Sequence, residues 1–430
     1  MTTLIYWFRQ DLRLADNPAF LRACADADYL LPIYVVEPSV EAKTEWGFDR
    51  VASHRQAFLR ESIEDLKRQL RALGSDLFVF SGEIQAVVSL ASIAVNATAI
   101  YCEQIEAPEE IDQVTRLQSS SIEVKQFWQS SMLEPHDLPF DLAAIPDVFT
   151  AFRQKVEKAN LKFANPVPPV TRIPPTPAWR TQQIQTIDLN AESHLKSFKG
   201  GETAAALHLK QYLDRRLPDT YKQTRNQLMG MDYSSKFSPW LSLGCMSART
   251  IAAELDDYES KYGANDGTYW LWFELLWRDY FRFLHFKYGR KLYRKTGLSD
   301  HPPSKFGRAQ FAQWCGGHTG EGLIDAAMTE LSTTGYLSNR LRQVVASYWI
   351  YDMKGDWRAA AAWFESQLID YDVYSNQGNW LYIAGRGTDP RGGRAFNVAK
   401  QTNDHDSNGK YRRRWLKQSG ESVKTELDEE

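Results

Sequence analysis

The sequence has few cysteines: only Cys24, Cys102, Cys245 and Cys315 occur in 430 residues. No two of them have the Cys-x-x-Cys spacing of a zinc or redox site, and so few, widely separated cysteines argue against a disulfide framework. No stretch approaches the roughly 18 uninterrupted apolar residues of a membrane span, and the first residues lack the basic and then apolar pattern of a secretory signal. We therefore expect a soluble, cytoplasmic protein with no membrane partner.

Neither sign of charge is in excess, because 51 Lys and Arg face 54 Asp and Glu, a net charge of −3. Any nucleic-acid surface must therefore be a local patch. The sequence also lacks a G-x-G-x-x-G fingerprint, a P-loop and a G-x-S-x-G elbow, and its eight scattered His argue against a metal site. Aromatic residues, in contrast, make up 13% of the chain, and ten of its 14 Trp lie from Trp240 onward. They predict an aromatic core, a stacking surface or redox centres.

Hydrophobic periodicity predicts an α/β region over residues 1–130. Short apolar runs that suit strands alternate there with amphipathic segments such as Ser53–Leu73. This alternation indicates a doubly wound parallel sheet. The expected strands are Thr3–Phe8, Tyr29–Val36, Asp76–Phe80, Thr98–Glu103 and Ile122–Trp128.

The rest of the chain predicts a connector and then a helical domain. Residues 131–199 are rich in proline, which disfavours long regular elements. Helical periodicity dominates residues 200–418, and the acid-rich residues 419–430 are expected to form a mobile tail. The predicted helices are Glu202–Leu217, Ser247–Tyr262, Thr268–Tyr288, Gly322–Thr333, Leu341–Met353 and Trp357–Leu368.

The helix expected at Thr268–Tyr288 has aromatic rings on every face, so it should be largely buried. Glu274, Trp277 and Arg278 share one of these faces. One interpretation is an intrahelical Glu274–Arg278 pair in an aromatic core. The other is a pocket wall where a carboxylate and an indole face meet a flat heterocycle. The basic residues from Arg278 to Lys295, interleaved with aromatic rings, suit either a nucleic-acid strand or an ordinary solvated face.

Two further segments could hold a ligand. Tyr233–Pro239 offers three serine hydroxyls, a lysine and backbone N–H groups before a proline, which suits a diphosphate or an ordinary helix start. Leu368–Trp380 places Asp370 and Asp372 near Asn376. Two acids at this spacing usually form a turn or a cap.

Taken in order, these segments resemble the photolyase/cryptochrome flavoproteins, and within them the cryptochrome-DASH branch. The resemblance covers nearly the whole chain, beginning with WFRQDLR at 7–13. The most specific blocks are GGETAA (200–205), TYKQTRN (220–226), DYSSKFSPWLSLG (232–244), NDGTYWLWFELLWRDYFRF (265–283), GYLSNRLRQ (335–343), DWR (356–358) and IDYDVYSNQGNWLY (369–382). Seven blocks in this order are far more specific than any single motif.

The resemblance implies an FAD inside the helical domain. Its diphosphate and ribose would lie against Tyr221, Ser234, Ser235, Lys236, Phe237 and Ser238, and its isoalloxazine against Arg342, Asp370, Asp372 and Asn376. Arg342 can stabilise an anionic reduced flavin, and the neutral Asn376 amide can meet N5 without a competing negative charge. An antenna such as methenyltetrahydrofolate is implied near Glu106 and Glu109, although an acidic first helical turn explains these carboxylates equally well.

The activity implied by the resemblance is light-driven repair of cyclobutane pyrimidine dimers, mainly in single-stranded DNA, by a monomer. The flipped-out dimer would lie among Glu274, Trp277, Arg278, Asn339, Arg340 and Tyr382, with Arg225 near the strand. Tyr382 stands where standard dimer photolyases have Trp, which fits the preference for single strands. The alternative is a blue-light photoreceptor that binds FAD and nucleic acid without efficient repair.

Electron supply is where the sequence departs from the family. Trp380 and Trp357 match the inner two tryptophans of the family's electron route, and with Glu274 and Asn376 they complete the expected catalytic set. Ser304 stands at the outer position, and no Trp lies between residues 277 and 314. We therefore expect slow photoreduction, or an exit through a tyrosine such as Tyr336 or Tyr348.

Overall fold

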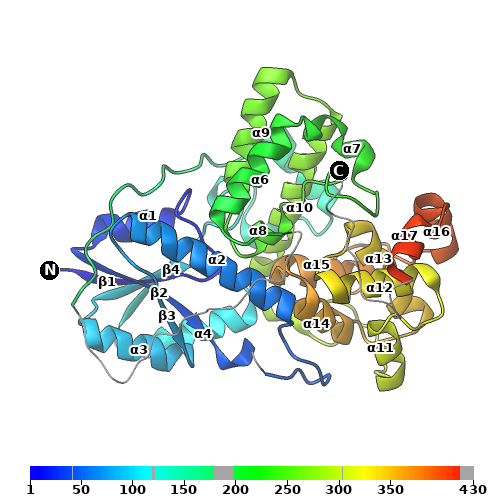
Figure 1. Ribbon diagram of the computed structural model, residues 1–430, viewed down its shortest axis with the longest axis horizontal. Coiled ribbons are helices and arrows are strands. Elements are labelled where there is room, and N and C mark those ends of the chain that lie inside the picture. The colour runs from blue at the N-terminus through cyan, green and yellow to red at the C-terminus, as the bar shows by residue number, and fades with distance from the viewer. Residues whose placement is uncertain (41, 119–121, 179–197, 303, 417–430) are drawn as a thin grey trace.

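The structure of the protein is a computed structural model that describes residues 1–40, 42–118, 122–178, 198–302 and 304–416. Five parallel strands form one sheet in the order β3-β2-β1-β4-β5, on the left of Figure 1. They are β1 (Thr3–Trp7), β2 (Tyr29–Val36), β3 (Phe78–Ser81), β4 (Ala99–Glu103) and β5 (Glu123–Phe127). The predicted doubly wound parallel sheet is thus confirmed, with strand ends close to those expected.

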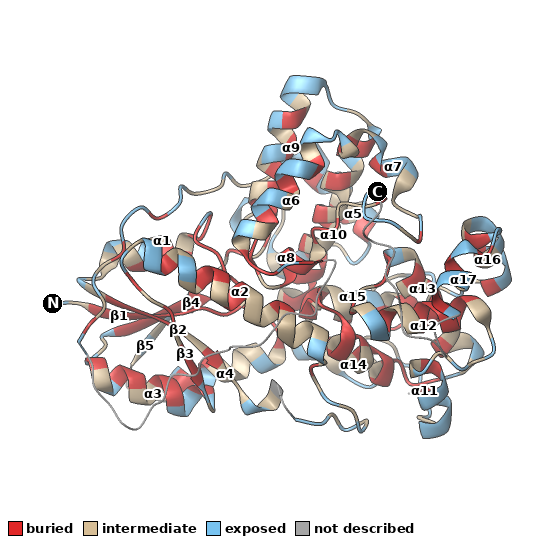
Figure 2. Ribbon diagram, in the orientation of Figure 1, coloured by how far each residue is buried: buried red, intermediate tan, exposed pale blue. Residues whose placement is uncertain are grey.

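Side chains alternate across this sheet and build a core on each face. Leu4 and Tyr6 of β1 pack on the face covered by α1 (Pro18–Asp26) and α2 (Ser53–Ala72). Ile5 and Trp7 point to the other face, under α3 (Ile84–Val95) and α4 (Pro108–Gln118). This period of two explains why β1 and β4 are buried throughout (Figure 2).

The connector contains more regular structure than its prolines indicate. Helix α5 (Phe149–Lys158) lies within it, preceded by the short 3₁₀ turns Pro135–Asp137 and Leu142–Ala144. The expectation of no long element fails here because residues 147–165 contain no proline. The densest prolines, at 166–177, follow without helix or strand. Residues 179–197 and the expected tail at 419–430 lie outside the described residues.

The second half of the described chain is helical, as predicted. Its α-helices are α6 (Glu202–Asp214), α7 (Tyr221–Thr224), α8 (Ser238–Ser242), α9 (Ala248–Tyr262), α10 (Asp266–Tyr288), α11 (Arg308–Cys315), α12 (Gly322–Thr334), α13 (Asn339–Ser347), α14 (Trp357–Gln367), α15 (Val373–Ile383), α16 (Val398–Asp406) and α17 (Lys410–Leu416). The 3₁₀ turns Leu217–Thr220 and Gly289–Tyr293 and the π-helical turn Tyr348–Asp352 link some of them.

Two helices, α6 and α13, differ most from their predicted bounds. Helix α6 stops at Asp214 rather than at residue 217, because Arg216 adopts a left-handed backbone with φ of 58° and Pro218 follows. Helix α13 begins at Asn339, where the Ser338 side chain accepts the Leu341 N–H, and it widens into the π-turn from Tyr348. Both ends are thus set by local backbone chemistry that periodicity does not report.

Helix α10 is the axis of the helical domain and also touches the connector. A capping box of Asn265 and Thr268 fixes its start. Buried Asp279 accepts the backbone N–H groups of Met132 and Leu133, at 2.9 and 2.8 Å. Burial raises the pKa of Asp279 to about 6, against the lowering effect of these two hydrogen bonds. The hydrophobic cluster under α1 and α2 continues without a break to α10, so the α/β and helical parts share one core.

Candidate functional site

A cavity of about 390 Å³ opens in the helical domain between α7, α8, α10, α13 and α15. It falls within the size range of small-molecule sites. Of the residues predicted to bind cofactor or DNA, its lining includes Tyr221, Arg225, Ser234, Ser235, Lys236, Phe237, Ser238, Glu274, Trp277, Arg278, Asn339, Arg342, Asp370 and Tyr382. A narrower slot of about 80 Å³ adds Asp372, Asn376 and Trp380 and shares Asn339, Arg342 and Asp370 with the larger cavity.

Lys236 supplies a buried cation to the larger cavity. Its backbone is left-handed, with φ of 55°, and its side chain is buried. Nζ lies 3.5 Å from the ring centroid of Tyr233 and 4.6 Å from that of Tyr336. Burial lowers the pKa of Lys236 to about 7, and no described residue accepts a hydrogen bond from it. An ammonium group in this state favours an anionic ligand.

Arg342 and Asp370 form an ion pair on the wall shared by the cavity and the slot. Arg342 Nη2 lies 2.8 Å from Asp370 Oδ2, and its Nε donates to the Leu337 carbonyl at 2.7 Å. Burial opposes the charge on Arg342, but Asp370 outweighs it and raises the pKa of the guanidinium. The other carboxylate oxygen of Asp370, Oδ1, is buried without a hydrogen-bond partner in the described structure. It is therefore ready to accept an N–H from a ligand in the slot.

Asp372 has a more structural position than its neighbour Asp370. Its carboxylate pairs with buried Arg282 and accepts the Ser375 N–H at 2.8 Å, which caps α15. Burial would raise the pKa of Asp372, but the two arginines Arg282 and Arg278 and this N–H lower it to about 2. The Asp372 carboxylate is thus fully used within the protein, by its ion pair with Arg282 and by its cap on α15. Asn376, one turn later, donates from Nδ2 to the Ala361 carbonyl at 3.1 Å.

On α10, the expected intrahelical Glu274–Arg278 pair does not form. Glu274 instead pairs with Arg225 of the segment after α7. Arg278 turns to the backbone and donates to the carbonyls of Ser130 and Leu241, and burial lowers its pKa to about 9. The i, i+4 spacing suits an ion pair, but each side chain bonds to a partner from another part of the chain instead. The carboxylate of Glu274 therefore lies on the cavity wall, as the second interpretation required.

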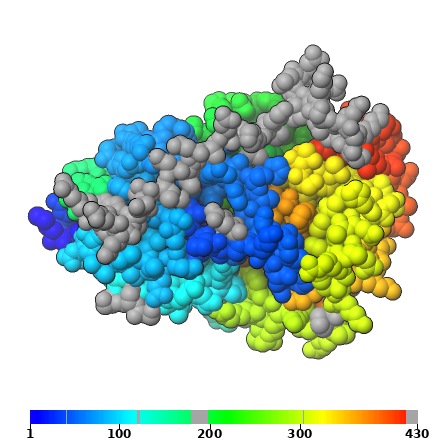
Figure 3. Space-filling model, turned by 60° about the horizontal axis from the view of Figure 1, so that its bottom comes forward, coloured from blue at the N-terminus to red at the C-terminus, as the bar shows by residue number. Residues whose placement is uncertain are grey.

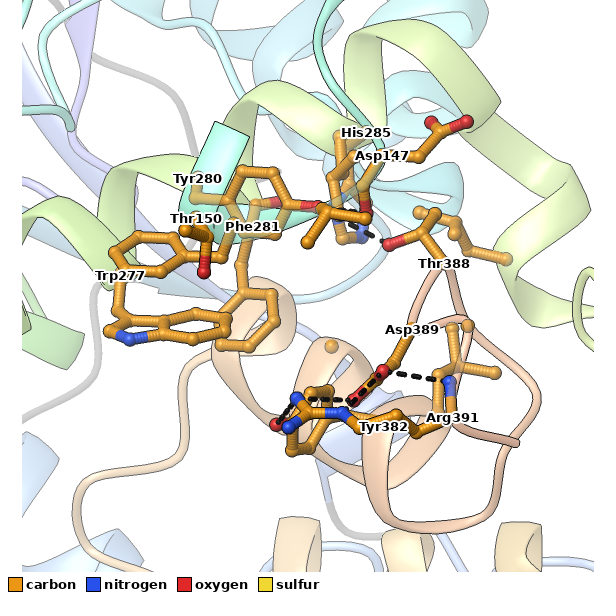
Figure 4. A pocket seen from close by; sticks show the side chains of 17 residues that line it. Asp147, Thr150, Trp277, Tyr280, Phe281, His285, Tyr382, Thr388, Asp389 and Arg391 are labelled. Carbon is orange, nitrogen blue, oxygen red and sulfur yellow. Dashed lines mark hydrogen bonds and ion pairs between the residues drawn. The ribbon is translucent and has the colours of Figure 1, made fainter. Parts of the chain in front are cut away.

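Trp277 presents a rigid aromatic surface to the same cavity. The Phe149 ring stacks on it, with centroids 3.7 Å apart and planes at 12°. Tyr382 meets it edge-on at 6.0 Å and 75°, and these residues also line a small apolar pocket behind the wall (Figure 4). The Tyr382 hydroxyl accepts N–H bonds from Arg391, at 3.0 Å, and from Arg394.

The remaining predicted residues lie around this site. Arg340 is outside the cavity lining and donates from Nη2 to Asn226 at 3.0 Å. Trp357 is buried, and its indole N–H donates to the Lys295 carbonyl at 3.2 Å. Trp380 is buried beside Phe364, with ring centroids 5.1 Å apart.

The basic run from residue 278 to 295 is not one surface. Arg282 is buried and pairs with Asp372, and half-buried Arg278 donates to the Ser130 carbonyl. Lys287 and Arg290 pair with Asp147 and Asp112 respectively. Exposed Lys291, Arg294 and Lys295 remain without an ion-pair partner in the described chain. These basic side chains therefore do not form one continuous, unpaired surface along the segment.

At the α/β edge, the two glutamates expected near an antenna already have partners. Both carboxylate oxygens of Glu109 accept from Arg50, at 2.8 and 2.5 Å, and Arg50 Nε donates to Glu365 at 2.9 Å. Glu106 Oε1 accepts from Gln104 at 2.6 Å. As placed, Glu109 offers no free carboxylate to a ligand.

The sequence analysis missed several residues of the site. Arg282 holds Asp372, while Arg391 and Arg394 hold Tyr382. The run Pro390–Arg394, PRGGR, is a visible local signal of a basic loop. The partners of Arg282 are 90 positions away and leave no signal in local spacing.

Comparison with known proteins identifies the family to which this architecture belongs. A family model described as DNA photolyase matches residues 4–175, and one described as the FAD binding domain of DNA photolyase matches residues 270–429. A cryptochrome DASH from Gloeobacter violaceus is 42% identical over 427 residues, covering 96% of this chain and 85% of that protein. The chain belongs to the photolyase/cryptochrome family, in its DASH branch.

Solved structures of this family share the fold. The crystal structure of a Synechocystis cryptochrome superposes with a TM-score of 0.92 at 39% identity, covering 97% of this chain and 89% of that one. A class III photolyase from Agrobacterium tumefaciens matches with a TM-score of 0.82 at 24% identity, which shows the shared fold. An archaeal photolyase from Sulfolobus tokodaii, described with two FAD molecules, matches with a TM-score of 0.75 at 25% identity.

The cavity fits the FAD that the family binds. The buried ammonium of Lys236 suits a diphosphate, and the unpartnered Oδ1 of Asp370 suits an N–H of a flat heterocycle. Among the described residues, no group of His, Cys, Asp and Glu could hold a metal ion. No described helix is long and apolar enough to cross a membrane.

Proposed function

We propose that the protein is a light-driven, FAD-dependent lyase that splits cyclobutane pyrimidine dimers, mainly in single-stranded DNA. The observation that carries the proposal is that Glu274 and Trp277 share one cavity with Lys236, Arg342 and Asp370. A cofactor held by Lys236, Arg342 and Asp370 would lie beside a base held by Glu274 and Trp277. This arrangement suits electron transfer over a short distance inside one cavity.

In this proposal, the chain divides its cavity between two parts of the cofactor. Tyr221 and the segment Ser234–Ser238 would hold the diphosphate and ribose, with Lys236 as the cation. Arg342, Asp370 and Asn376 would hold the isoalloxazine, and Arg342 would favour its negative charge. Bound FAD would supply a photoexcited electron and take it back after the dimer has split.

Glu274 and Trp277 would receive the flipped-out base. The ion pair with Arg225 keeps Glu274 oriented, so that its carboxylate can accept an N–H from the base edge. Trp277, supported by the stacked Phe149 ring, offers a flat surface that does not need to move. Asn339, Arg340 and Arg278 would complete the rim toward the strand, with Tyr382 as the second aromatic wall.

The preference for single strands rests on the cost of extruding a dimer. Flipping a base from a duplex costs unpairing and unstacking energy, which a single strand largely avoids. Tyr382 has its hydroxyl bound to Arg391 and Arg394, so the wall is more polar than an indole would make it. Such a wall offers less apolar contact to offset the cost of flipping.

The decisive experiment is blue-light repair of a thymine-dimer-containing single-stranded oligonucleotide by purified protein whose FAD has been chemically reduced. A dark sample and the matching duplex serve as controls. We expect repair only in light, and faster repair of the single strand than of the duplex. Equal rates on both substrates would contradict the strand preference, and strand binding without repair would contradict the lyase.

The second candidate is a blue-light photoreceptor that binds FAD and nucleic acid without efficient repair. The relatives at about 40% identity are named cryptochromes, which favours it. Retention of Glu274, Trp277 and Asn376 on the walls of the cavity and slot favours the lyase. A photoreceptor would show a light-dependent change in protease sensitivity or strand affinity while the dimer stays intact.

A further inference from the structure

The electron route implied by the family lacks its outer tryptophan in this chain. Trp380 and Trp357 are 2% and 3% exposed, so neither meets solvent. The Trp357 N–H is also held by the Lys295 carbonyl. An oxidised indole becomes a stable neutral radical only when it can lose this proton. A route that ends at Trp357 is therefore incomplete, and Ser304 cannot extend it.

Trp46 lies close to the position of the missing outer tryptophan, Ser304. It belongs to the loop between the sheet and α2, yet its ring centroid is 4.8 Å from that of Phe306, at 61°. Phe306 is two positions from Ser304, and the guanidinium of Arg358, the residue after Trp357, lies 5.4 Å from the centre of the Trp46 ring. The Trp46 side chain packs against the cluster that contains Trp357 and Trp380.

The domain arrangement explains how a residue so early in the chain reaches this place. Arg50, just after Trp46, bonds Glu365 of α14, and the Ala52 N–H donates to the Ser366 carbonyl at 2.9 Å. Figure 3 shows the blue surface of this amino-terminal segment directly against the yellow-green surface of the helical domain. The loop is thus fastened to the helix that carries Trp357 at its start.

The surroundings of Trp46 suit the terminal electron donor of such a route. Its side chain is half-buried, and its indole N–H has no acceptor among the described residues, so water can take the proton. Arg358 disfavours a positive ring, but Asp356 pairs with it at 2.6 Å and offsets the charge. Loss of the proton then makes the radical neutral and removes the repulsion.

The other exits are less suitable. Tyr336 lies in the cofactor cavity between two cations, with Lys236 Nζ 4.6 Å and Arg342 5.2 Å from its ring centre. Trp363 contacts Phe48, at 5.0 Å between centroids, but its indole nitrogen is buried without a partner. Neither can release a proton as readily as Trp46.

We propose that Trp46 is the outer electron donor in light-driven reduction of the bound flavin, an inference that rests on the photochemical function proposed above. One electron leaves the Trp380 indole for the flavin, Trp357 refills Trp380, and Trp46 refills Trp357. The Trp46 N–H proton goes to water. An external thiol then returns one hydrogen atom to the Trp46 radical and becomes a thiyl radical.

The test compares Trp46→Phe with wild type in full-length protein loaded with oxidised FAD. Phenylalanine keeps an aromatic edge against Phe306 but cannot be oxidised. The matched control is Trp272→Phe, a partly buried indole on α10 whose N–H donates to Lys162 far from this route. Under blue light, we measure the rate of flavin reduction with excess thiol. In matched samples without thiol, we measure the tryptophan-radical signal by electron paramagnetic resonance and tryptophan oxidation by peptide mass spectrometry.

We expect light to oxidise Trp46 in the wild type, and Trp46→Phe to slow reduction several-fold and to abolish the long-lived radical signal. Trp272→Phe should match wild type, and Trp46→Tyr should restore part of the rate. Wild-type rate in Trp46→Phe, loss of the signal in Trp363→Phe instead, or a wild type that light does not reduce would each overturn the inference.

Three further measurements separate this inference from the proposed repair function. FAD content and the thermal unfolding midpoint of Trp46→Phe should equal those of wild type, which excludes misfolding as the cause. Repair by chemically reduced Trp46→Phe should also be unchanged, since that assay does not need the tryptophan route. Absence of repair in every variant would refute the lyase, while the comparison of reduction rates would still decide the assignment of Trp46.

Discussion

The buried pair between Arg282 and Asp372 should carry a large share of the stability of the site. The two residues are 2% and 7% exposed. Asp372 both neutralises Arg282 and caps α15, the helix that carries Asn376 and Trp380. Asp372→Asn tests the pair alone, because asparagine is also a good capping residue. The substitution removes the charge and leaves the helix start satisfied.

The expected cost follows from the charge that is left behind. Removal of one partner from a buried ion pair costs about 3–5 kcal/mol, because the other charge stays buried without compensation. We therefore expect the free energy of unfolding to fall by about 3 kcal/mol in Asp372→Asn, and by about 1 kcal/mol more in Asp372→Ala, which also lacks the cap. Urea denaturation followed by tryptophan fluorescence measures both. Asp214→Asn, from an exposed pair with Lys210, is the matched control and should change little.

The same pair predicts an acid-dependent loss of stability. The pKa of Asp372 falls from 3.8 to about 2 in the folded protein. Folding therefore favours the ionised carboxylate, and the ionised carboxylate stabilises the folded state. This contribution is complete above about pH 4 and is lost as the pH falls toward 2, a change of about 2 kcal/mol. Asp372→Asn should lack it.

The result that would refute this reasoning is an Asp372→Asn protein that unfolds at the wild-type urea concentration. If that variant also lost FAD, Asp372 would be a direct cofactor ligand, as the family resemblance implies, and not the anchor of α15. If it lost stability and kept FAD at saturating concentration, the ion pair would be its main function. The two readouts together therefore assign the residue.

Three further predictions concern single side chains. Glu274→Ala should lower dimer repair by at least tenfold, because loss of a charged contact costs about 1.4 kcal/mol or more. FAD absorbance should stay at the wild-type level. Equal loss of repair and of FAD would show that Glu274 contacts the cofactor. Lys236→Met should weaken FAD binding. Wild-type binding should itself weaken as the pH rises through about 7, where the Lys236 ammonium of the apo-protein loses its proton. Titration of apo-protein followed by flavin fluorescence checks both, and a pH-independent affinity would contradict the role of Lys236 as the cation for the diphosphate. Arg50→Met should free the Glu109 carboxylate and tighten binding of methenyltetrahydrofolate, and weaker binding by equilibrium dialysis would show that Arg50 is part of that site.

Much of the α/β half could be predicted from the sequence because its signals are local. The strand β2 has its predicted bounds, Tyr29–Val36, since a largely buried parallel strand is a continuous apolar run between turns. The helix α10 was also recognisable, because its aromatic residues exclude a surface position. Helix ends were less accurate, as α6 shows, because one left-handed residue, Arg216, stops a helix without changing the apolar period.

The site could be predicted only as a set of residues, not as a set of partners. Glu274 and Arg278 have ideal helical spacing, yet each bonds elsewhere because Arg225 and two buried carbonyls are closer in the folded chain. Trp46 was missed for the same reason, since residue 306 lies 260 positions later. Partners chosen by long-range packing leave no mark in local spacing.

These long-range contacts also explain why the α/β half cannot be regarded as a separate antenna support. The guanidinium of Arg55 on α2 lies 4.4 Å from the ring centre of Tyr371, and the Glu106 N–H donates to the Tyr374 hydroxyl at 2.6 Å. Tyr371 directly follows Asp370, so the α/β half holds the loop that presents the unpartnered carboxylate oxygen to the slot. Because the same half also supplies Trp46, which packs against the cluster that contains Trp357 and Trp380, we expect it to contribute to the position of bound FAD and, by the route proposed above, to the electron supply.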